Sequence, residues 1–76
     1  MKDILQTIIF NLVDDKEAVE IKEIDGEKSV IFEVKVAEAD MGKVIGRQGR
    51  LAKSIRTLIK AVANKEQKRV TVEFIG

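Results

Sequence analysis

Apolar residues recur with two different periods in the first half of the chain. Residues 2–13 predict an amphipathic helix, because their apolar side chains recur every three or four positions. These side chains are Ile4, Leu5, Ile8, Ile9 and Leu12. Residues 19–22 then alternate strictly, which is the period of a half-buried strand. Asp25-Gly26 comes next and predicts a hairpin with a type I′ turn, whose two central residues need positive φ.

A second strand is expected over residues 30–36, where the alternation is clearest. Its buried face is predicted to carry Val30, Phe32, Val34 and Val36. The opposite face carries Ile31 among charged residues, so it is expected to be largely exposed.

The second half of the chain predicts two helices and a final strand. Asp40 suits the N-cap of a short helix over residues 41–45, which Gly46 ends. A longer helix over residues 50–63 is expected to have a buried stripe on one side and a basic ridge on the other. The stripe consists of Leu51, Ile55, Leu58, Ile59 and Val62, and the ridge of Arg50, Lys53, Arg56 and Lys60. Residues 69–75 alternate again and predict a strand.

The element order is therefore α-β-β-α-α-β. This order predicts an α+β fold in which three helices cover one face of a three-stranded sheet. The 76 residues are expected to form a single domain over residues 1–76, because one core of this size leaves no room for a second.

Composition argues for binding rather than chemistry. The chain has no Cys and no His, which removes thiolate metal sites and the commonest general base. Its acidic residues are scattered, so neither a metal site nor a cofactor is expected, and the protein is not expected to be an enzyme. So short a chain has little room for a cavity enclosing a small-molecule substrate. No apolar run is long enough to span a membrane, and a cytoplasmic location is the expectation.

Charge is strongly segregated although the chain carries a net charge of only +1. Residues 1–40 hold five basic and eleven acidic side chains, whereas residues 41–60 hold six basic side chains and no acid. Such a block can attract a polyanion locally, since a potential depends on distribution as well as on the total. The alternative is that the block is only a solvated helix face.

Gly46-Arg47-Gln48-Gly49 lies inside the basic block, between the two predicted helices. Two glycines allow tight backbone turns and close approach of another backbone, and the following helix start offers N–H groups to an anion. Lys43, Arg50 and Lys53 flank the loop, which suits a sugar-phosphate backbone. The spacing matches neither a P-loop nor a dinucleotide-binding fingerprint. The alternative is a helix C-cap followed by a turn.

The stretch Asp-Met-Gly-Lys-Val-Ile-Gly-Arg-Gln-Gly-Arg over residues 40–50 resembles the V-I-G-x-x-G signature of KH domains. The element order resembles the type II KH topology, and the whole chain is most similar to the small bacterial single-KH RNA-binding family of the KhpA kind. The resemblance implies that the loop clamps about four nucleotides of single-stranded RNA. The residues expected to bind RNA are Lys43, Val44, Ile45, Gly46, Arg47, Gln48, Gly49, Arg50 and Lys53. The resemblance also implies that the bases lie in a groove between the two helices and the adjoining strand. Of the apolar pair Val44 and Ile45, one is expected to line this groove and the other the core. Unlike many relatives, the approach to the motif over residues 37–40 lacks proline.

The resemblance also implies partners and a role. It suggests an RNA chaperone or post-transcriptional regulator, with a link to cell-envelope growth and cell shape. Such proteins form homodimers or pair with a larger KH-containing RNA-binding protein. The alternative is a KH-like protein–protein adaptor or ribosome-associated module with little RNA affinity of its own. Either the outward strand face around Ile31 or the apolar first helix could supply the dimer surface.

Overall fold

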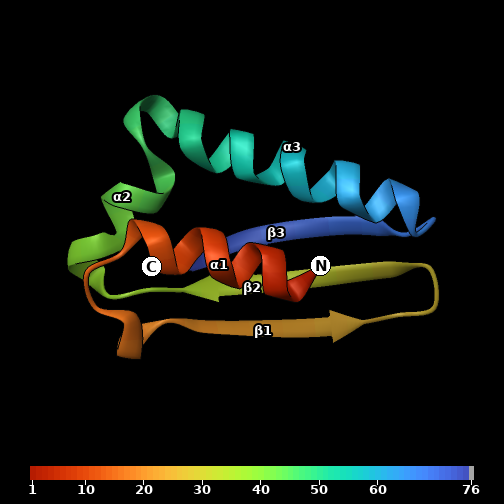
Figure 1. The fold of residues 1–76 in the computed structure, drawn as a ribbon, viewed down its shortest axis with the longest axis horizontal. Helices are drawn as coiled ribbons and strands as arrows, with labels where there is room; N and C mark the ends of the chain where they lie inside the picture. Colours follow the sequence, from red (N-terminus) through yellow and green to blue (C-terminus); the bar gives the residue numbers. More distant parts are fainter. Residues whose placement is uncertain (76) are drawn as a thin grey trace.

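The computed structural model describes residues 1–75, and its elements follow the predicted order (Figure 1). They are α1 (Lys2–Leu12), β1 (Glu20–Asp25), β2 (Ser29–Lys35), α2 (Met41–Ile45), α3 (Arg50–Lys65) and β3 (Arg69–Ile75). Three short 3₁₀ turns, which the sequence pattern did not predict, join them at Lys16–Ala18, Glu38–Asp40 and Arg47–Gly49.

The sheet is mixed, with strand order β1-β2-β3. β1 pairs antiparallel with β2, as a hairpin must, and β3 pairs parallel with β2 on its other side. The long connection through α2 and α3 makes the parallel pairing possible. As a result β2 is central, and over residues 1–75 β1 and β3 each have one edge without a neighbouring strand.

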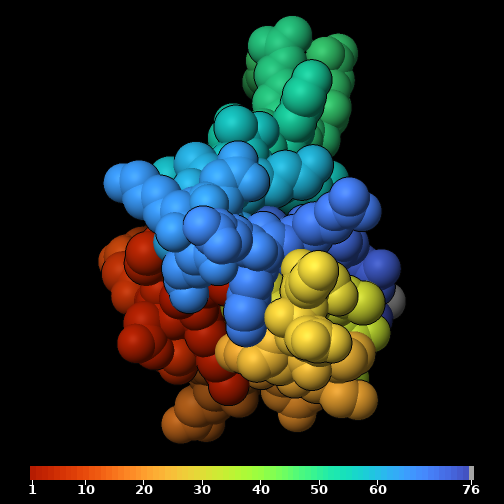
Figure 2. Space-filling view, turned by 90° about the vertical axis from the view of Figure 1, so that its right-hand side faces the viewer, coloured from red at the N-terminus to blue at the C-terminus, as the bar shows by residue number. Residues whose placement is uncertain are grey.

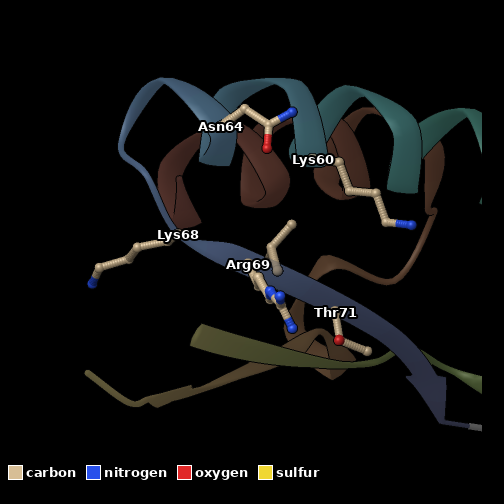
Figure 3. A pocket seen from close by; sticks show the side chains of 6 residues that line it. Lys60, Asn64, Lys68, Arg69 and Thr71 are labelled. Atoms are coloured by element: carbon tan, nitrogen blue, oxygen red, sulfur yellow. The ribbon is translucent and has the colours of Figure 1, made fainter. Parts of the chain in front are cut away.

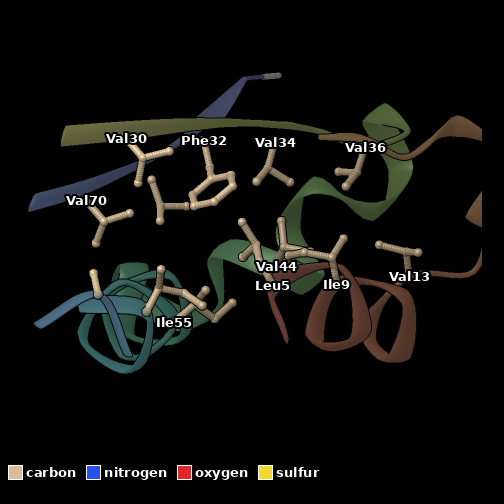
Figure 4. Packing of buried hydrophobic residues seen from close by; sticks show 13 residues of the cluster. Leu5, Ile9, Val13, Val30, Phe32, Val34, Val36, Val44, Ile55 and Val70 are labelled. Atoms are coloured by element: carbon tan, nitrogen blue, oxygen red, sulfur yellow. The ribbon is translucent and has the colours of Figure 1, made fainter. Parts of the chain in front are cut away.

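All three helices lie on one face of the sheet, as predicted, and the core fills the space between them (Figure 4). Alternation along β2 turns Val30, Phe32 and Val34 toward the helices, where each is buried. They meet buried side chains from every helix. These are Leu5 and Ile9 from α1, Val44 from α2, and Ile55, Ile59 and Ala63 from α3.

The hairpin is confirmed, but its turn is not the one predicted. Neither Asp25 nor Gly26 has positive φ, so the type I′ assignment is wrong. β1 continues through Asp25, and the Gly26 N–H donates to the Ser29 carbonyl at 2.7 Å. The tip is therefore at residues 27–28, two residues later in the chain than predicted.

The stripe predicted for α3 is rotated in the structure. Its fully buried positions are Ala52, Ile55, Ile59 and Ala63. Leu58 was predicted to be buried, yet 48% of it is exposed, and Ile4 of α1 is 41% exposed. The prediction was wrong at Leu58 because it favoured large side chains over the alanines that the sheet covers.

α3 also runs two residues beyond the predicted end. It closes with paired backbone bonds, from the Lys68 N–H to the Ala63 carbonyl and from the Gln67 N–H to the Asn64 carbonyl. This is the Schellman arrangement, in which one residue adopts positive φ. Here that residue is Gln67, at φ 58°. Within residues 1–75, no helix has the length and apolar character needed to cross a membrane.

Candidate nucleic-acid interface

The loop at Gly46–Gly49 projects from the body of the protein. Figure 2 shows this segment, in green, standing above the rest of the surface. Gly46 ends α2 with φ 78° and ψ 179°, a conformation that is almost restricted to glycine. Gln48 and Gly49 are left-handed, at φ 58° and 75°. Three of the four loop residues therefore have positive φ, and the chain turns sharply into α3.

The glycines of this region serve different purposes. A Cβ on Gly46 would lie 2.6 Å from the Leu51 Cβ, so the fold itself requires glycine there. A Cβ on Gly49 would meet nothing within 4 Å, and the same is true of Gly42 in α2. The space above Gly49 is thus open to a ligand, whereas that above Gly46 is filled by α3.

The amides at the start of α3 are less available than the sequence suggested. The Gly49 N–H donates to the Gly46 carbonyl at 3.3 Å, and the Arg50 N–H to the Arg47 carbonyl. No side chain caps the helix, so its first turn still presents the positive end of the helix dipole. An anion at the N-terminal end of α3 would be held by the helix dipole and by side chains more than by the N–H groups of Gly49 and Arg50.

The apolar pair before the loop is divided by the fold. Val44 is fully buried in the core beneath β2, whereas Ile45 is only half-buried beside the core. The sequence left open which of the two lines the groove and which packs in the core. In the structure, Ile45 is the one with surface to offer to a ligand.

Cationic and polar side chains lie on the loop and on the start of α3 that follows it. Arg47 and Gln48 are exposed on the loop, and Arg50 and Lys53 are exposed on the first turn of α3. Among residues 1–75 none of these three cations forms a salt bridge. Their charges are free to attract a polyanion.

Lys43 is different, because it is already paired. Its ammonium contacts the Asp14 carboxylate and lies 3.4 Å from that of Asp40. Asp14 is the main reason that the pKa of Lys43 is raised. The structure thus ties this predicted RNA contact to the acidic segment that follows α1.

Asp40 occupies the N-cap position of α2, but its carboxylate does not bond the first turn of the helix. It accepts the N–H of Asp15 at 3.0 Å and is 2% exposed. That backbone bond is the main cause of the lowered pKa of Asp40. Asp40 therefore fastens the start of α2 to the loop after α1, and through α2 it positions Gly46–Gly49.

Arg56 links the basic ridge to the sheet, a connection that the sequence did not reveal. Its Nε donates to the Val72 carbonyl at 3.0 Å, and its guanidinium lies 5.3 Å from the centre of the Phe74 ring. No local pattern in the sequence indicates this bond, because its acceptor lies on β3, 16 residues later in the chain. Among residues 1–75, no cluster of acidic side chains could hold a metal ion.

Comparison with known proteins agrees with the element order. The family model described as "KhpA/KhpB, KH domain" matches residues 2–74. "RNA-binding protein KhpA" of Clostridium acetobutylicum is 60% identical over 75 residues, covering 99% of this chain and 100% of the relative. The protein of the same name from Caldanaerobacter subterraneus subsp. tengcongensis is 59% identical with the same coverage. That from Aquifex aeolicus is 45% identical, covering 99% of this chain and 95% of the relative.

Proposed function

The chain belongs to the KhpA/KhpB family of KH domains, and we propose that residues 1–76 form one domain that clamps single-stranded RNA on the Gly46–Gly49 loop. Its relatives are named RNA-binding proteins over essentially the same length. The fold is the type II KH arrangement, with α2, the loop and α3 in consecutive positions. The observation that carries the proposal is the projecting, acid-free loop with open space above Gly49.

Each element of the loop has a part in the proposed grip. The glycine backbone lets a sugar-phosphate chain lie close to the protein, and the dipole of α3 favours its charge. Arg47, Arg50 and Lys53 supply the neutralising cations, and Gln48 supplies an exposed amide. Ile45 offers an apolar contact to a base. About four nucleotides fit such a clamp.

Lys43 contributes less to the grip than Arg47 does. It would have to leave Asp14 and Asp40, or share them, in order to contact a phosphate. We assign it chiefly to holding α2 in place.

Binding of this kind changes no covalent bond in the RNA. Membership of an RNA-binding family supports a binding role over a catalytic one. We therefore place the protein among RNA chaperones or post-transcriptional regulators of the cytoplasm, with cell-envelope growth and cell shape as the process that the family suggests.

The salt dependence of RNA affinity tests the clamp. Three or four neutralised phosphates should give a slope of about −2 to −3 in a plot of log affinity against log salt concentration. Fluorescence anisotropy of a labelled single-stranded RNA measures it. A flat response would mean that no phosphate clamp exists.

We further propose that the protein self-associates through the exposed apolar side chains of α1 and α3. Leu58 stands between two hollows, one lined by Ile4, Thr7 and Ile8 and the other by Ser54, Thr57 and Ala61. A face that presents both a projecting side chain and hollows can match a second copy of itself across a two-fold axis. Two copies would also combine two weak clamps into a stronger one. A larger KH-containing protein with a similar face would compete for the same surface.

Substitution of Leu58 tests this interface. Leu58→Asp should convert a dimer into a monomer in light scattering after size-exclusion chromatography. Ile24→Asp is the matched control, because Ile24 is 44% exposed but lies on β1. A monomeric wild-type protein, or a Leu58→Asp variant that remains dimeric, would refute the assignment.

A further inference from the structure

β1 has a row of backbone groups along its outer edge that β2 does not use. Figure 1 places β1 at the border of the sheet, on the side away from α3. The Gly26 N–H donates to the Ser29 carbonyl, which continues the register of β1 and β2 by one pair. Since the bonded pairs of an antiparallel ladder alternate, the even-numbered residues of β1 bond to β2. The N–H and C=O groups of Ile21, Glu23 and Asp25 therefore point outward.

The edge of β1 is accessible to another strand. Proteins commonly protect a sheet edge with proline, a bulge or a covering element. β1 contains no proline, its register with β2 is unbroken over all six residues, and five of the six are exposed. An extended peptide can therefore add to β1 as a fourth strand, held by main-chain hydrogen bonds.

A hollow of about 170 Å³ lies between α1 and the start of β1, lined by Lys2, Gln6, Val19 and Ile21. Ile21 pairs with buried Val34, so its side chain lies on the helix side of the sheet. A residue directly opposite Ile21 on an added strand points its side chain to the same side. A threonine suits this position, because its methyl group can contact Val19 and Ile21 and its hydroxyl group the Gln6 amide.

Charge favours a basic partner for this edge. Residues 13–28, which join α1 to β2, hold seven acidic side chains and three basic ones. Asp25 is paired with Lys68, whereas over residues 1–75 Glu20 and Glu23 are exposed and form no salt bridge. Opposite charges on facing strand residues stabilise a sheet, so lysine or arginine is favoured opposite these glutamates. RNA would be repelled from the same surface.

The free edge of β3 has the opposite character. Lys60 and Arg69 stand beside it, and no acidic side chain lines the hollow between β3 and α3 (Figure 3). A basic peptide is therefore expected at β1 and not at β3.

A second copy of this chain matches the edge of β1 poorly. When two identical edges pair antiparallel, outward-pointing residues must face one another, so the two-fold axis passes through a residue of β1. An axis near the middle of the strand then sets Lys22 against Lys22 or Glu23 against Glu23. Like charges directly opposite one another destabilise the pair.

We propose that β1 is a docking edge for an extended, lysine- or arginine-rich segment of another protein. The segment adds as an antiparallel fourth strand and bonds to the backbone of Ile21, Glu23 and Asp25. Because β1 lies across the sheet from α3, the segment leaves the Gly46–Gly49 loop accessible. The docking edge does not depend on the RNA clamp.

A designed peptide tests the docking edge. The capped peptide Lys-Val-Lys-Glu-Thr-Lys, laid antiparallel, places lysines opposite Asp25, Glu23 and Glu20 and threonine opposite Ile21. In NMR titrations it should shift the amide signals of Ile21, Glu23 and Asp25 and slow the hydrogen exchange of these N–H groups. The charge-reversed peptide Glu-Val-Glu-Lys-Thr-Glu is the control and should leave them unchanged.

Two variants separate backbone pairing from charge. Glu23→Pro removes one outward N–H without breaking a bond to β2, a position where proline is tolerated, and should abolish peptide binding. Glu23→Lys should weaken binding about fivefold, because it sets two lysines opposite one another. Glu73→Lys is the matched control on β3 and should bind the peptide as wild type does. Thermal unfolding checks that the variants are folded.

Four outcomes would overturn the inference. The peptide could shift no amide of β1, or the charge-reversed peptide could bind equally well. Glu23→Pro could bind as wild type does; should that variant not fold, equal binding by Glu23→Lys and Glu73→Lys decides against the docking edge. Protection of the Ile21 and Glu23 amides that rises with protein concentration alone would assign the edge to a second copy.

Discussion

The two ends of α3 are both sharp turns, but they differ in how their polar groups are satisfied. Each turn contains a glutamine in the left-handed region, Gln48 at the N-terminal end and Gln67 at the C-terminal end, both at φ 58°. At the C-terminal end, backbone bonds to Ala63 and Asn64 close the turn, and Lys68 is tied to Asp25. At the N-terminal end, Gly46 and Gly49 lie on either side of the glutamine and no side chain caps the helix. Within residues 1–75, Arg47, Arg50 and Lys53 form no salt bridge there.

The turn at the C-terminal end of α3 is closed by bonds within the protein, whereas the turn at the N-terminal end is accessible to a ligand. A Schellman end satisfies its own carbonyls and needs nothing from outside. The start of α3 keeps its dipole, its cations and the space above Gly49 accessible. We infer that the second arrangement is maintained for a ligand, because a purely structural turn would not need it.

The largest effect is expected at Gly46. Gly46→Ala should lower the free energy of unfolding by on the order of 3 kcal/mol, because the new Cβ would clash with Leu51 in a backbone conformation reserved for glycine. Urea denaturation measures it. A variant as stable as wild type would show that the loop relaxes freely, and the contrast with the other end of α3 would be lost.

Substitution of Asp40 is expected to cause a smaller loss of stability, which depends on pH. Because the pKa of Asp40 is lowered by the Asp15 N–H, its charged form stabilises the fold above the unfolded pKa of about 3.9. Asp40→Asn should therefore melt at a lower temperature than wild type at pH 7. The difference should vanish as the pH falls through the folded pKa of Asp40. A gap that persists in strong acid would mean that Asp40 acts through shape and not through its charge.

Gly49→Ala should separate stability from binding. The positive φ should cost only about 1 kcal/mol, since a Cβ meets no neighbour. RNA affinity should fall about tenfold, because the methyl group would occupy the space proposed for the RNA backbone. Gly42→Ala, equally unobstructed but inside a helix, is the stability control and should gain up to about 1 kcal/mol. Unchanged RNA binding by Gly49→Ala would remove Gly49 from the interface.

The smallest effect on stability is expected from removing the backbone strain at the two left-handed glutamines. Gln67→Gly and Gln48→Gly should each stabilise the protein by about 0.5 kcal/mol, because glycine adopts positive φ without strain. Only Gln48→Gly should also weaken RNA binding. If Gln67→Gly weakened it equally, the two ends would not differ in function. Thermal melts and anisotropy titrations provide the two readings.

Local patterns predicted the elements and the position of the loop. Alternation identified the buried face of β2, and the glycine spacing inside the basic block located the turn before α3. The residue at which α3 ends was harder to predict, because Gln67 occupies the position where glycine or asparagine usually indicates a helix C-terminus. The prediction that Leu58 is buried was wrong. How far α1 covers that side of α3 cannot be predicted from the sequence of α3 alone.

Long-range contacts account for the remaining gaps. Asp40 was expected to bond its own helix, but its partner Asp15 lies 25 residues earlier in the sequence. Lys43 was grouped with the free cations, and only the folded chain brings Asp14 to it. Arg56 likewise meets a carbonyl on β3 that no local pattern identifies.

Matched charge changes at the two ends of α3 test the central claim most directly. Arg47→Asp with Gln48→Asp alters the charge by the same amount as Lys65→Asp with Gln67→Asp, and each pair includes a left-handed glutamine. With tetrauridylate as the probe, the first pair should abolish binding and the second should leave affinity within about threefold of wild type. Both should keep a cooperative melt. Equal losses from the two pairs, or binding that survives the first, would contradict an RNA clamp at Gly46–Gly49.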